Sequence, residues 1–231
     1  MTATEPRRDR RHARRQETLT ELVDVALQVM SEQGAAGLSL GEVARRMGMR
    51  PPSLYVYFPS KNAVYDAVFT QGWQALLADM RQHDEGVEEA WDLGAYLLAL
   101  GTSYVRWSVE HPTYTQLMAW RPVPGYEPSA EAYVPAVATI EATHQVFARL
   151  QQRGLLCSDV PVEHLLRSWT VLLSGIVTQQ LANAPQEPFE SGRFTALLPD
   201  VVQMYVKQYG APASVPVAPE KGHRHGRNTP L

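Results

Sequence analysis

Residues 38–61 read LSLGEVARRMGMRPPSLYVYFPSK, in which two short helical patterns meet across a glycine. Ser39 can cap a first helix, because the apolar residues after it follow the i, i+3, i+4, i+7 spacing of one buried face. Gly48 then ends that helix, since glycine enters the left-handed conformation without a Cβ clash. Pro51 and the proline after it suit the first turn of a second helix, which we expect to end near Phe58. This spacing is typical of a helix-turn-helix.

Two helices of about two turns each bury too little surface to be stable alone and must pack on a third helix. In the DNA-binding form of this motif, the second helix enters the major groove while the first crosses the backbone. A purely structural helical hairpin has the same spacing. The pattern by itself therefore leaves both interpretations open.

The side chains favour the DNA-binding form. Ala44, Gly48, the run from Leu54 to Phe58 and Lys61 stand where the tetracycline-repressor (TetR) family of transcription regulators keeps its alanine, turn glycine, LYxYF run and lysine. The chain resembles that family closely over about residues 15–65, and elsewhere only in architecture. The resemblance implies that Tyr55, Tyr57 and Lys61 hold DNA phosphates. Ordinary packing of an amphipathic ring is the alternative for each tyrosine.

The second helix also departs from the family pattern. Arg50, Pro51, Pro52 and Val56 replace residues that are more often small, polar or basic. Arg50 and Ser53 remain as hydrogen-bonding groups for base edges, and Pro51 and Val56 offer apolar contact to thymine methyls. The predicted DNA contacts are Arg14, Arg15, Ser39, Arg50, Pro51, Ser53, Tyr55, Val56, Tyr57 and Lys61.

Positive charge gathers near the same end of the chain. Residues 1–61 carry ten Lys and Arg against seven Asp and Glu, whereas residues 62–231 carry eleven against seventeen. A basic end on an acidic body suggests an electrostatic footprint for DNA. Six arginines fall within residues 1–15, which we interpret as a disordered basic arm that follows phosphates or enters the minor groove. A solvated tail without defined contacts is the alternative.

Composition indicates an ordinary soluble chain of 231 residues with 45% hydrophobic content. No window is apolar enough to span a membrane and no secretory signal precedes the first helix, so we expect a cytoplasmic protein. The single cysteine, Cys157, excludes an internal disulfide and a cysteine-rich metal cluster. It is interpreted as a small residue near a helix end, with a redox sensor as the alternative. We predict neither a metal site nor a cofactor.

The remaining sequence predicts an all-α chain of about nine helices. The expected helices span residues 16–33, 39–47, 51–58, 61–82, 87–110, 113–120, 130–153, 159–183 and 191–209. A helix-turn-helix domain would cover residues 16–61, a ligand-binding and dimerisation domain residues 62–210, and a disordered tail residues 211–231. The run from His111 to Met118 and the proline-rich loop after it resemble the WHG-type ligand domain of some TetR-like proteins.

Aromatic and methionine side chains of the central helices are candidates for an apolar effector pocket, and most of them are expected to be plain core. The candidates are Tyr104, Trp107, His111, Tyr114, Met118, Trp120, Tyr133, His144 and Trp169. The last two helices are apolar on more than one face, which predicts a four-helix dimer interface, with burial inside one protomer as the alternative. Its candidates are Leu165, Trp169, Leu172, Ile176, Leu197, Val201, Val202 and Tyr205.

Together these features predict a homodimeric, ligand-responsive regulator, most simply a repressor, that binds a pseudo-palindromic duplex operator and is released by a small hydrophobic or aromatic effector. An enzyme is the main rival class. The sequence has no glycine-rich phosphate loop, GxSxG elbow, HExxH or CxxC motif, and we predict no catalytic residue. A ligand-binding protein that uses the same cavity, or a dimeric adaptor that never touches DNA, also remains open.

Overall fold

The computed structural model describes residues 7–84 and 92–212, and over these ranges the chain is helical apart from turns and one isolated β-bridge between Leu156 and Gly210. The helices are α1 (Arg7–Gln33), α2 (Leu40–Arg46), α3 (Pro51–Leu54), α4 (Lys61–Asp84), α5 (Leu93–Glu110), α6 (Pro112–Ala119), α7 (Val134–Gln152), α8 (Val162–Asn183) and α9 (Leu198–Tyr209). Three 3-10 turns, Ala35–Gly37, Phe189–Ser191 and Thr195–Leu197, join them. The all-α class is confirmed.

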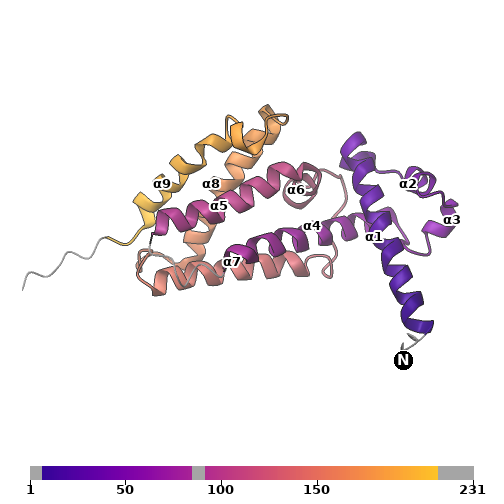
Figure 1. The fold of residues 1–231 in the computed structure, drawn as a ribbon, viewed down its shortest axis with the longest axis horizontal. Helices are drawn as coiled ribbons and strands as arrows, with labels where there is room; N and C mark the ends of the chain where they lie inside the picture. The colour runs from indigo at the N-terminus through magenta and orange to yellow at the C-terminus, as the bar shows by residue number, and fades with distance from the viewer. Residues whose placement is uncertain (1–6, 85–91, 213–231) are drawn as a thin grey trace, which may run out of the picture.

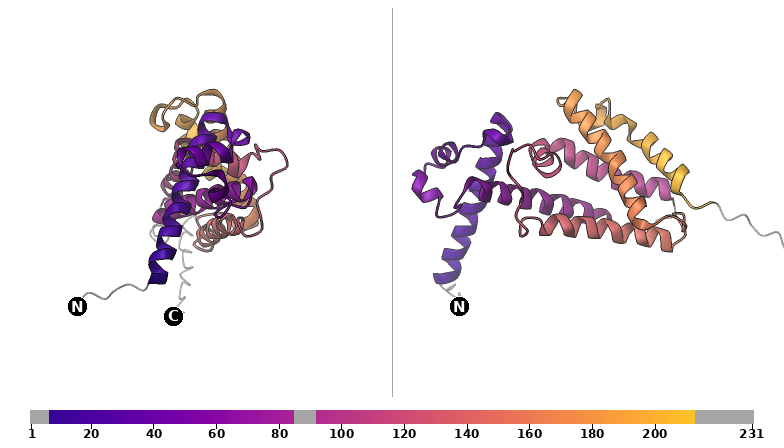
Figure 2. Two further views of the ribbon diagram at one scale, coloured as in Figure 1. Left: turned by 90° about the vertical axis from the view of Figure 1, so that its right-hand side faces the viewer. Right: turned by 180° about the vertical axis from the view of Figure 1, so that it is seen from behind.

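The molecule is elongated, with α1, α2 and α3 at one end and α9 at the other (Figure 1). Helix α4 leaves the three N-terminal helices and runs into the larger body, where it packs between α5 and α7. Helices α8 and α9 pack on α5 on the side away from α3, and the reverse view shows the same order (Figure 2). Helix α1 contacts α4 and α6, whereas α2 and α3 lie at the end of the molecule, on the side of α1 away from the larger body.

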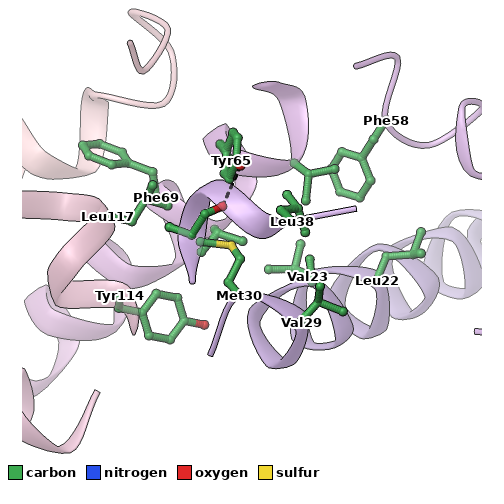
Figure 3. Close-up of a cluster of buried hydrophobic side chains, with 14 of the residues drawn as sticks. Leu22, Val23, Val29, Met30, Leu38, Phe58, Tyr65, Phe69, Tyr114 and Leu117 are labelled. Atoms are coloured by element: carbon green, nitrogen blue, oxygen red, sulfur yellow. Dashed lines mark hydrogen bonds between the residues drawn. The ribbon is translucent and has the colours of Figure 1, made fainter. Parts of the chain in front are cut away.

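A first core holds the N-terminal helices together. Leu22, Met30, Leu38 and Phe58 are among its buried side chains, contributed by α1 and by the segments on either side of α2 and α3 (Figure 3). Tyr114 and Leu117 of α6 belong to the same cluster, so this core continues into the larger helical body. The predicted third helix under the two short ones is confirmed as α1.

Helix α1 begins at Arg7, nine residues earlier than predicted. The expectation of a disordered arm is thus wrong for residues 7–15, which extend α1 past α2 and α3 (Figure 1). Residues 1–6 of that arm lie outside the described part of the chain. So do the first residues of the predicted 87–110 helix and residues 213–231 of the predicted tail.

Prolines fall at the starts of the last three α-helices. Pro135 lies in the first turn of α7 and Pro199 in the first turn of α9, where a missing amide proton costs nothing. Helix α8 follows Pro161 at its N-cap, and no side chain caps it. Helix α8 therefore begins at Val162, three residues later than the predicted start at residue 159.

A second core joins α5, α7, α8 and α9, and it corrects part of the predicted dimer interface. Five of the candidates are buried inside a single protomer, with exposed fractions of 6% or less: Leu165, Trp169, Ile176, Val202 and Tyr205. Leu172 and Val201 are half-buried against the same core, and only Leu197 is exposed. The helices are apolar on several faces because they have several neighbours within one chain.

Candidate DNA-binding surface and ligand pocket

The turn between α2 and α3 has the geometry that the sequence predicts. Gly48 adopts φ 62°, the left-handed region that favours glycine. Arg50 then takes an extended conformation at the N-cap of α3, with prolines in the first turn. The second helix is shorter than expected, since it ends at Leu54 and residues 55–57 continue as turns.

The short helix α3 divides cleanly into an inner and an outer face. Leu54 is 1% exposed and Phe58 is 7% exposed, and both lie in the first core. Tyr55 and Val56 are 53% and 68% exposed. Arg50, Pro51 and Ser53 are exposed as well. We call these exposed residues of α3 and its two flanking turns the reader surface (Arg50, Pro51, Ser53, Tyr55 and Val56). It holds the four side chains predicted to meet bases together with Tyr55, which is predicted to contact phosphate.

Other predicted contacts are already engaged within the chain. Lys61 Nζ donates to the Ala36 carbonyl at 3.0 Å and lies 5.5 Å from the centre of the Tyr65 ring. The guanidinium of Arg15 lies 5.3 Å from the centre of the half-buried Tyr57 ring. Lysine has three donors, so Lys61 retains hydrogen-bonding capacity beyond the Ala36 contact.

Ser39 is chiefly a structural residue. Its Oγ accepts a hydrogen bond from the Glu42 amide at 3.4 Å, which caps α2 as the sequence predicts. Arg14 is exposed on α1.

An ion-pair cluster beside the reader surface escaped the sequence analysis. Glu42 accepts hydrogen bonds from Arg45 at 2.8 and 2.7 Å and from Arg46 at 2.8 Å, and Arg46 also reaches Glu32 of α1 at 2.6 Å. These bonds from Arg45 and Arg46 lower the pKa of Glu42 to about 2. The spacing of Glu42 to Arg45 and Arg46 on one helix was a readable signal, whereas the link to Glu32 needs the tertiary fold.

A pocket of about 460 Å³ opens between four helices of the larger body. It is lined by Trp73, Leu76 and Met80 of α4, Leu100 and Tyr104 of α5, Thr139, Ile140 and Thr143 of α7, and Leu166, Arg167, Trp169, Thr170, Val171 and Leu173 of α8. The lining is predominantly apolar, and the volume falls in the range usual for small-molecule sites, about 300–1,000 Å³.

Two of the nine predicted pocket residues, Tyr104 and Trp169, line this pocket. Trp107 instead stacks on His111 with ring centres 4.8 Å apart, and Tyr114 packs beside them. Met118 lies against α4 beside Gly72. Trp107, His111, Tyr114 and Met118 thus pack where α4, α5 and α6 meet, outside the pocket.

The last three predicted pocket residues also lie outside its lining. Trp120 and Tyr133 are 39% and 41% exposed. His144 Nε2 lies 3.4 Å from Glu163 Oε1, between α7 and α8. The choice of pocket candidates by aromatic or methionine side chain missed the threonines of α7 and the lining residues of α4. Residue type alone does not show where neighbouring helices separate and leave a cavity.

Helix α4 contributes to both regions. Val64, Tyr65 and Phe69 of its first half lie in the core beneath the reader surface, while Trp73, Leu76 and Met80 of its second half line the pocket. Tyr65 Oη donates to the Ala35 carbonyl at 2.7 Å (Figure 3). Asp66 accepts from Tyr126 Oη at 2.9 Å, which ties α4 to the loop before α7. One continuous helix therefore connects the core of the helix-turn-helix with the pocket wall.

These features define an all-helical DNA-binding regulator with a separate ligand pocket, and the comparisons with known proteins agree. Residues 22–68 match the family described as bacterial regulatory proteins, tetR family, and residues 97–202 match the tetracyclin repressor-like C-terminal domain. The chain belongs to the TetR family of transcription regulators, which are not enzymes.

Individual relatives are distant. The regulator Mb1846 of Mycobacterium bovis is 27% identical over 118 residues, which are 51% of this chain and 50% of that protein. SrpR of Pseudomonas putida is 23% identical over 194 residues, 80% of this chain and 87% of that protein. The crystal structure of the regulatory protein SCO4313 has a TM-score of 0.68 at 21% identity and covers 85% of this chain and 98% of its own.

The match to the mycobacterial relative spans about half of that protein's length. Within the described ranges, no helix is both long enough and apolar enough to cross a lipid bilayer. The same ranges contain no group of three or more His, Cys, Asp or Glu side chains placed to hold a metal ion.

Proposed function

We propose that this regulator acts in the cytoplasm as a homodimeric repressor that binds a pseudo-palindromic operator and leaves it when a small apolar effector fills the pocket. The observation that carries the proposal is the exposed reader surface on α3, set above a core that α4 shares with the pocket wall. The division into a DNA-binding part, residues 16–61, and a ligand-binding and dimerisation part, residues 62–210, belongs to this proposal.

On DNA, Arg50 and Ser53 would donate to base edges while Pro51 and Val56 contact thymine methyls. Tyr55, Tyr57 and Lys61 would lie along phosphates, which fixes the register without reading sequence. Arg14 and Arg15, together with the capping Ser39, would follow the flanking backbone. The helical start of α1 supports this role, because a helix presents its basic side chains with less loss of chain entropy than a disordered arm would.

A single reader surface contacts few bases, so specificity requires two copies. A twofold dimer addresses two half-sites about 34–36 Å apart, or one turn of the DNA helix. The exposed apolar side chains of α8 and α9 support an interface there: Val171 is 70% exposed, Met204 63% and the preceding Leu197 47%. Leu172 and Val201 would lie at its edge.

Effector binding would change the spacing of the two reader surfaces through α4. A ligand shifts this equilibrium only by its difference in affinity for the two dimer shapes, commonly about 1–3 kcal/mol. An apolar or flat effector suits the pocket, where Tyr104 and Trp169 offer ring faces.

The proposal is tested by enriching binding sites from a random duplex library and measuring affinity for the best site by fluorescence anisotropy. We expect twofold-symmetric sites. The R50A/S53A double variant should bind about tenfold or more weakly, since each direct base contact contributes about 1–3 kcal/mol.

A matched control is R121A, which removes an exposed arginine from the loop after α6. It should bind as the wild type does. Unchanged affinity of R50A/S53A, or enrichment of sites without symmetry, would contradict the proposal. No retention on generic duplex DNA at low salt would instead favour the adaptor without DNA binding.

A further inference from the structure

The pocket walls are apolar even where they carry hydroxyl groups. Thr139 Oγ1 donates to the Pro135 carbonyl at 2.8 Å, and Thr143 Oγ1 donates to the Thr139 carbonyl at 2.9 Å. Thr170 Oγ1 donates to the Leu166 carbonyl at 2.9 Å. Each hydroxyl hydrogen is therefore used within its own helix. A ligand beside the threonines meets no threonine donor, so hydrocarbon suits these walls best. On the α4 wall, the ring nitrogen of Trp73 is buried without a hydrogen-bond partner in the described part of the chain.

The only charged side chain in the lining is Arg167, on the exposed side of α8. Ile140 and Val171 also line the pocket and are 57% and 70% exposed. These three residues form the pocket rim (Ile140, Arg167 and Val171). The rim thus combines two apolar side chains with one permanent positive charge.

The hydrogen-bond donors of the Arg167 guanidinium are not used by other described residues. Among the described residues, it makes no hydrogen bond and no ion pair within 4 Å. The nearest acidic group along the helix is Glu163, one turn earlier, and its carboxylate lies 3.4 Å from His144 of α7. Glu163 therefore has a partner across the helix pair. Its own backbone amide and His144 lower the pKa of Glu163 most and the charge of Arg167 contributes least, but no hydrogen bond is formed between Glu163 and Arg167, so the guanidinium can still bind an incoming group.

We propose that the effector is an amphiphile, with an apolar body enclosed by α4, α5, α7 and α8 and an anionic head, such as a carboxylate or a phosphate ester, beside Arg167. This inference rests on the proposed effector function of the pocket. A guanidinium matches the oxygens of such heads in a forked, two-bond geometry. The ammonium head of a cationic amphiphile would meet repulsion at the same rim.

The test uses three probes that share one alkyl chain: decanoate, decanol and decyltrimethylammonium. Binding is followed through the fluorescence of Trp73 and Trp169, which line the pocket, so no DNA is needed. We expect decanoate to bind about two- to fivefold more tightly than decanol, the upper part of the range for a solvent-exposed charge pair, and the ammonium probe to bind more weakly than either. Decyl phosphate in place of decanoate distinguishes the two head groups.

The R167Q variant should bind decanol as the wild type does but lose the preference for decanoate, and R167E should prefer the ammonium probe. K207Q, which removes one exposed positive charge from α9 outside the pocket lining, should keep the wild-type preference. The proposal is overturned if the wild type binds decanol as tightly as decanoate, if R167Q keeps the preference, or if no probe binds.

These outcomes are separable from the proposed function. DNA release by decanol and decanoate alike would preserve the effector pocket and refute the anionic head. A chain that binds no DNA but discriminates the probes through Arg167 would preserve the amphiphile site and refute the regulator mechanism.

Discussion

At the scale of single residues, Tyr65 is the most direct link between α4 and the helix-turn-helix. Its ring is buried and its hydroxyl donates to the Ala35 carbonyl at 2.7 Å, just before the segment that leads into α2. The same carbonyl also accepts from the Leu38 amide at 3.3 Å. Removal of the tyrosine hydroxyl would therefore leave the carbonyl with one partner.

We expect Y65F to lower the free energy of unfolding by about 0.5–1.5 kcal/mol, the usual net contribution of one hydrogen bond. Urea unfolding followed by circular dichroism measures this change. Y55F is the matched control, because Tyr55 is exposed and its hydroxyl should contribute within about 0.5 kcal/mol. Equal effects of the two variants would show that the Tyr65 bond does not support the fold.

Glu42 gives the fold a dependence on acid. Its contacts with Arg45 and Arg46 lower its pKa from 4.5 to about 2 in the folded chain. Stability from these pairs is fully present above the unfolded pKa and is lost as the pH falls through the folded pKa. We expect E42Q to lose stability relative to the wild type above pH 4.5, and this difference to shrink as the pH approaches 2. Urea midpoints across that window measure it, and a constant difference would contradict the assignment.

Some residue roles can be predicted from the sequence and others cannot. Gly48 and the buried face of α2 could be assigned from spacing alone, because local conformation and helical periodicity determine their roles, whereas Leu54 and Phe58 could be matched only through the family resemblance. Residues such as Thr139 and Arg167 could not be assigned to the pocket. Their position depends on the angle at which α7 and α8 separate, and no local pattern encodes that angle.

At the scale of elements, the close approach of α4 and α6 explains a glycine inside a long helix. A Cβ on Gly72 would lie 2.7 Å from Met118 Sδ and 2.8 Å from Tyr114 Cδ1. The methionine can move, but the tyrosine ring is buried and moves only with α6. Gly72 therefore sets the distance between the helix that carries both regions and its neighbour.

We expect G72A to destabilise the protein by about 1–3 kcal/mol, since overpacking outweighs the gain in helix propensity of about 1 kcal/mol. Thermal unfolding measures the effect. The control is G41A in α2, where the nearest atom to a new Cβ, Ser39 Oγ, lies at an ordinary 3.7 Å. That variant should be neutral or slightly more stable. If G72A is more stable than the wild type, α6 can shift away from the new methyl group at little cost, and the prediction is wrong.

Helix existence was easier to predict than helix limits. Helices α7 and α9 exist as predicted, but each begins next to a proline in its first turn, later than the predicted starts at residues 130 and 191. The start of α1 was missed, because an arginine-rich segment without apolar residues carries no periodic signal even where the helix continues through it. The early end of α3 has a different cause. After Leu54, the amides of Tyr57 and Phe58 both donate to the Leu54 carbonyl, so the chain continues as a turn and not as a regular helix.

At the scale of the whole molecule, the apolar side chains that the protomer leaves exposed indicate where the second copy of the proposed dimer would pack. The sequence assigned to the interface several side chains that the protomer buries for itself, Trp169 and Tyr205 among them. Hydrophobic pattern alone cannot separate a core from an interface, because both require the same residues. The exposed apolar side chains of the folded protomer give a sharper prediction.

Val171 of α8 and Met204 of α9 are 70% and 63% exposed, so each can accept a charge without disturbing the core of a protomer, although a charge at Val171 also changes the pocket rim. If these two helices form the twofold contact, V171E/M204E should be a folded monomer with far weaker operator binding. Dimerisation would bury carboxylates that have no positively charged partner, which is energetically costly. Light scattering after size exclusion measures the mass, and circular dichroism checks the fold. V137E, at a 60% exposed position of α7, is the matched control and should remain dimeric. A monomeric V137E beside a dimeric V171E/M204E would move the interface to α7, and with it the distance between the two reader surfaces.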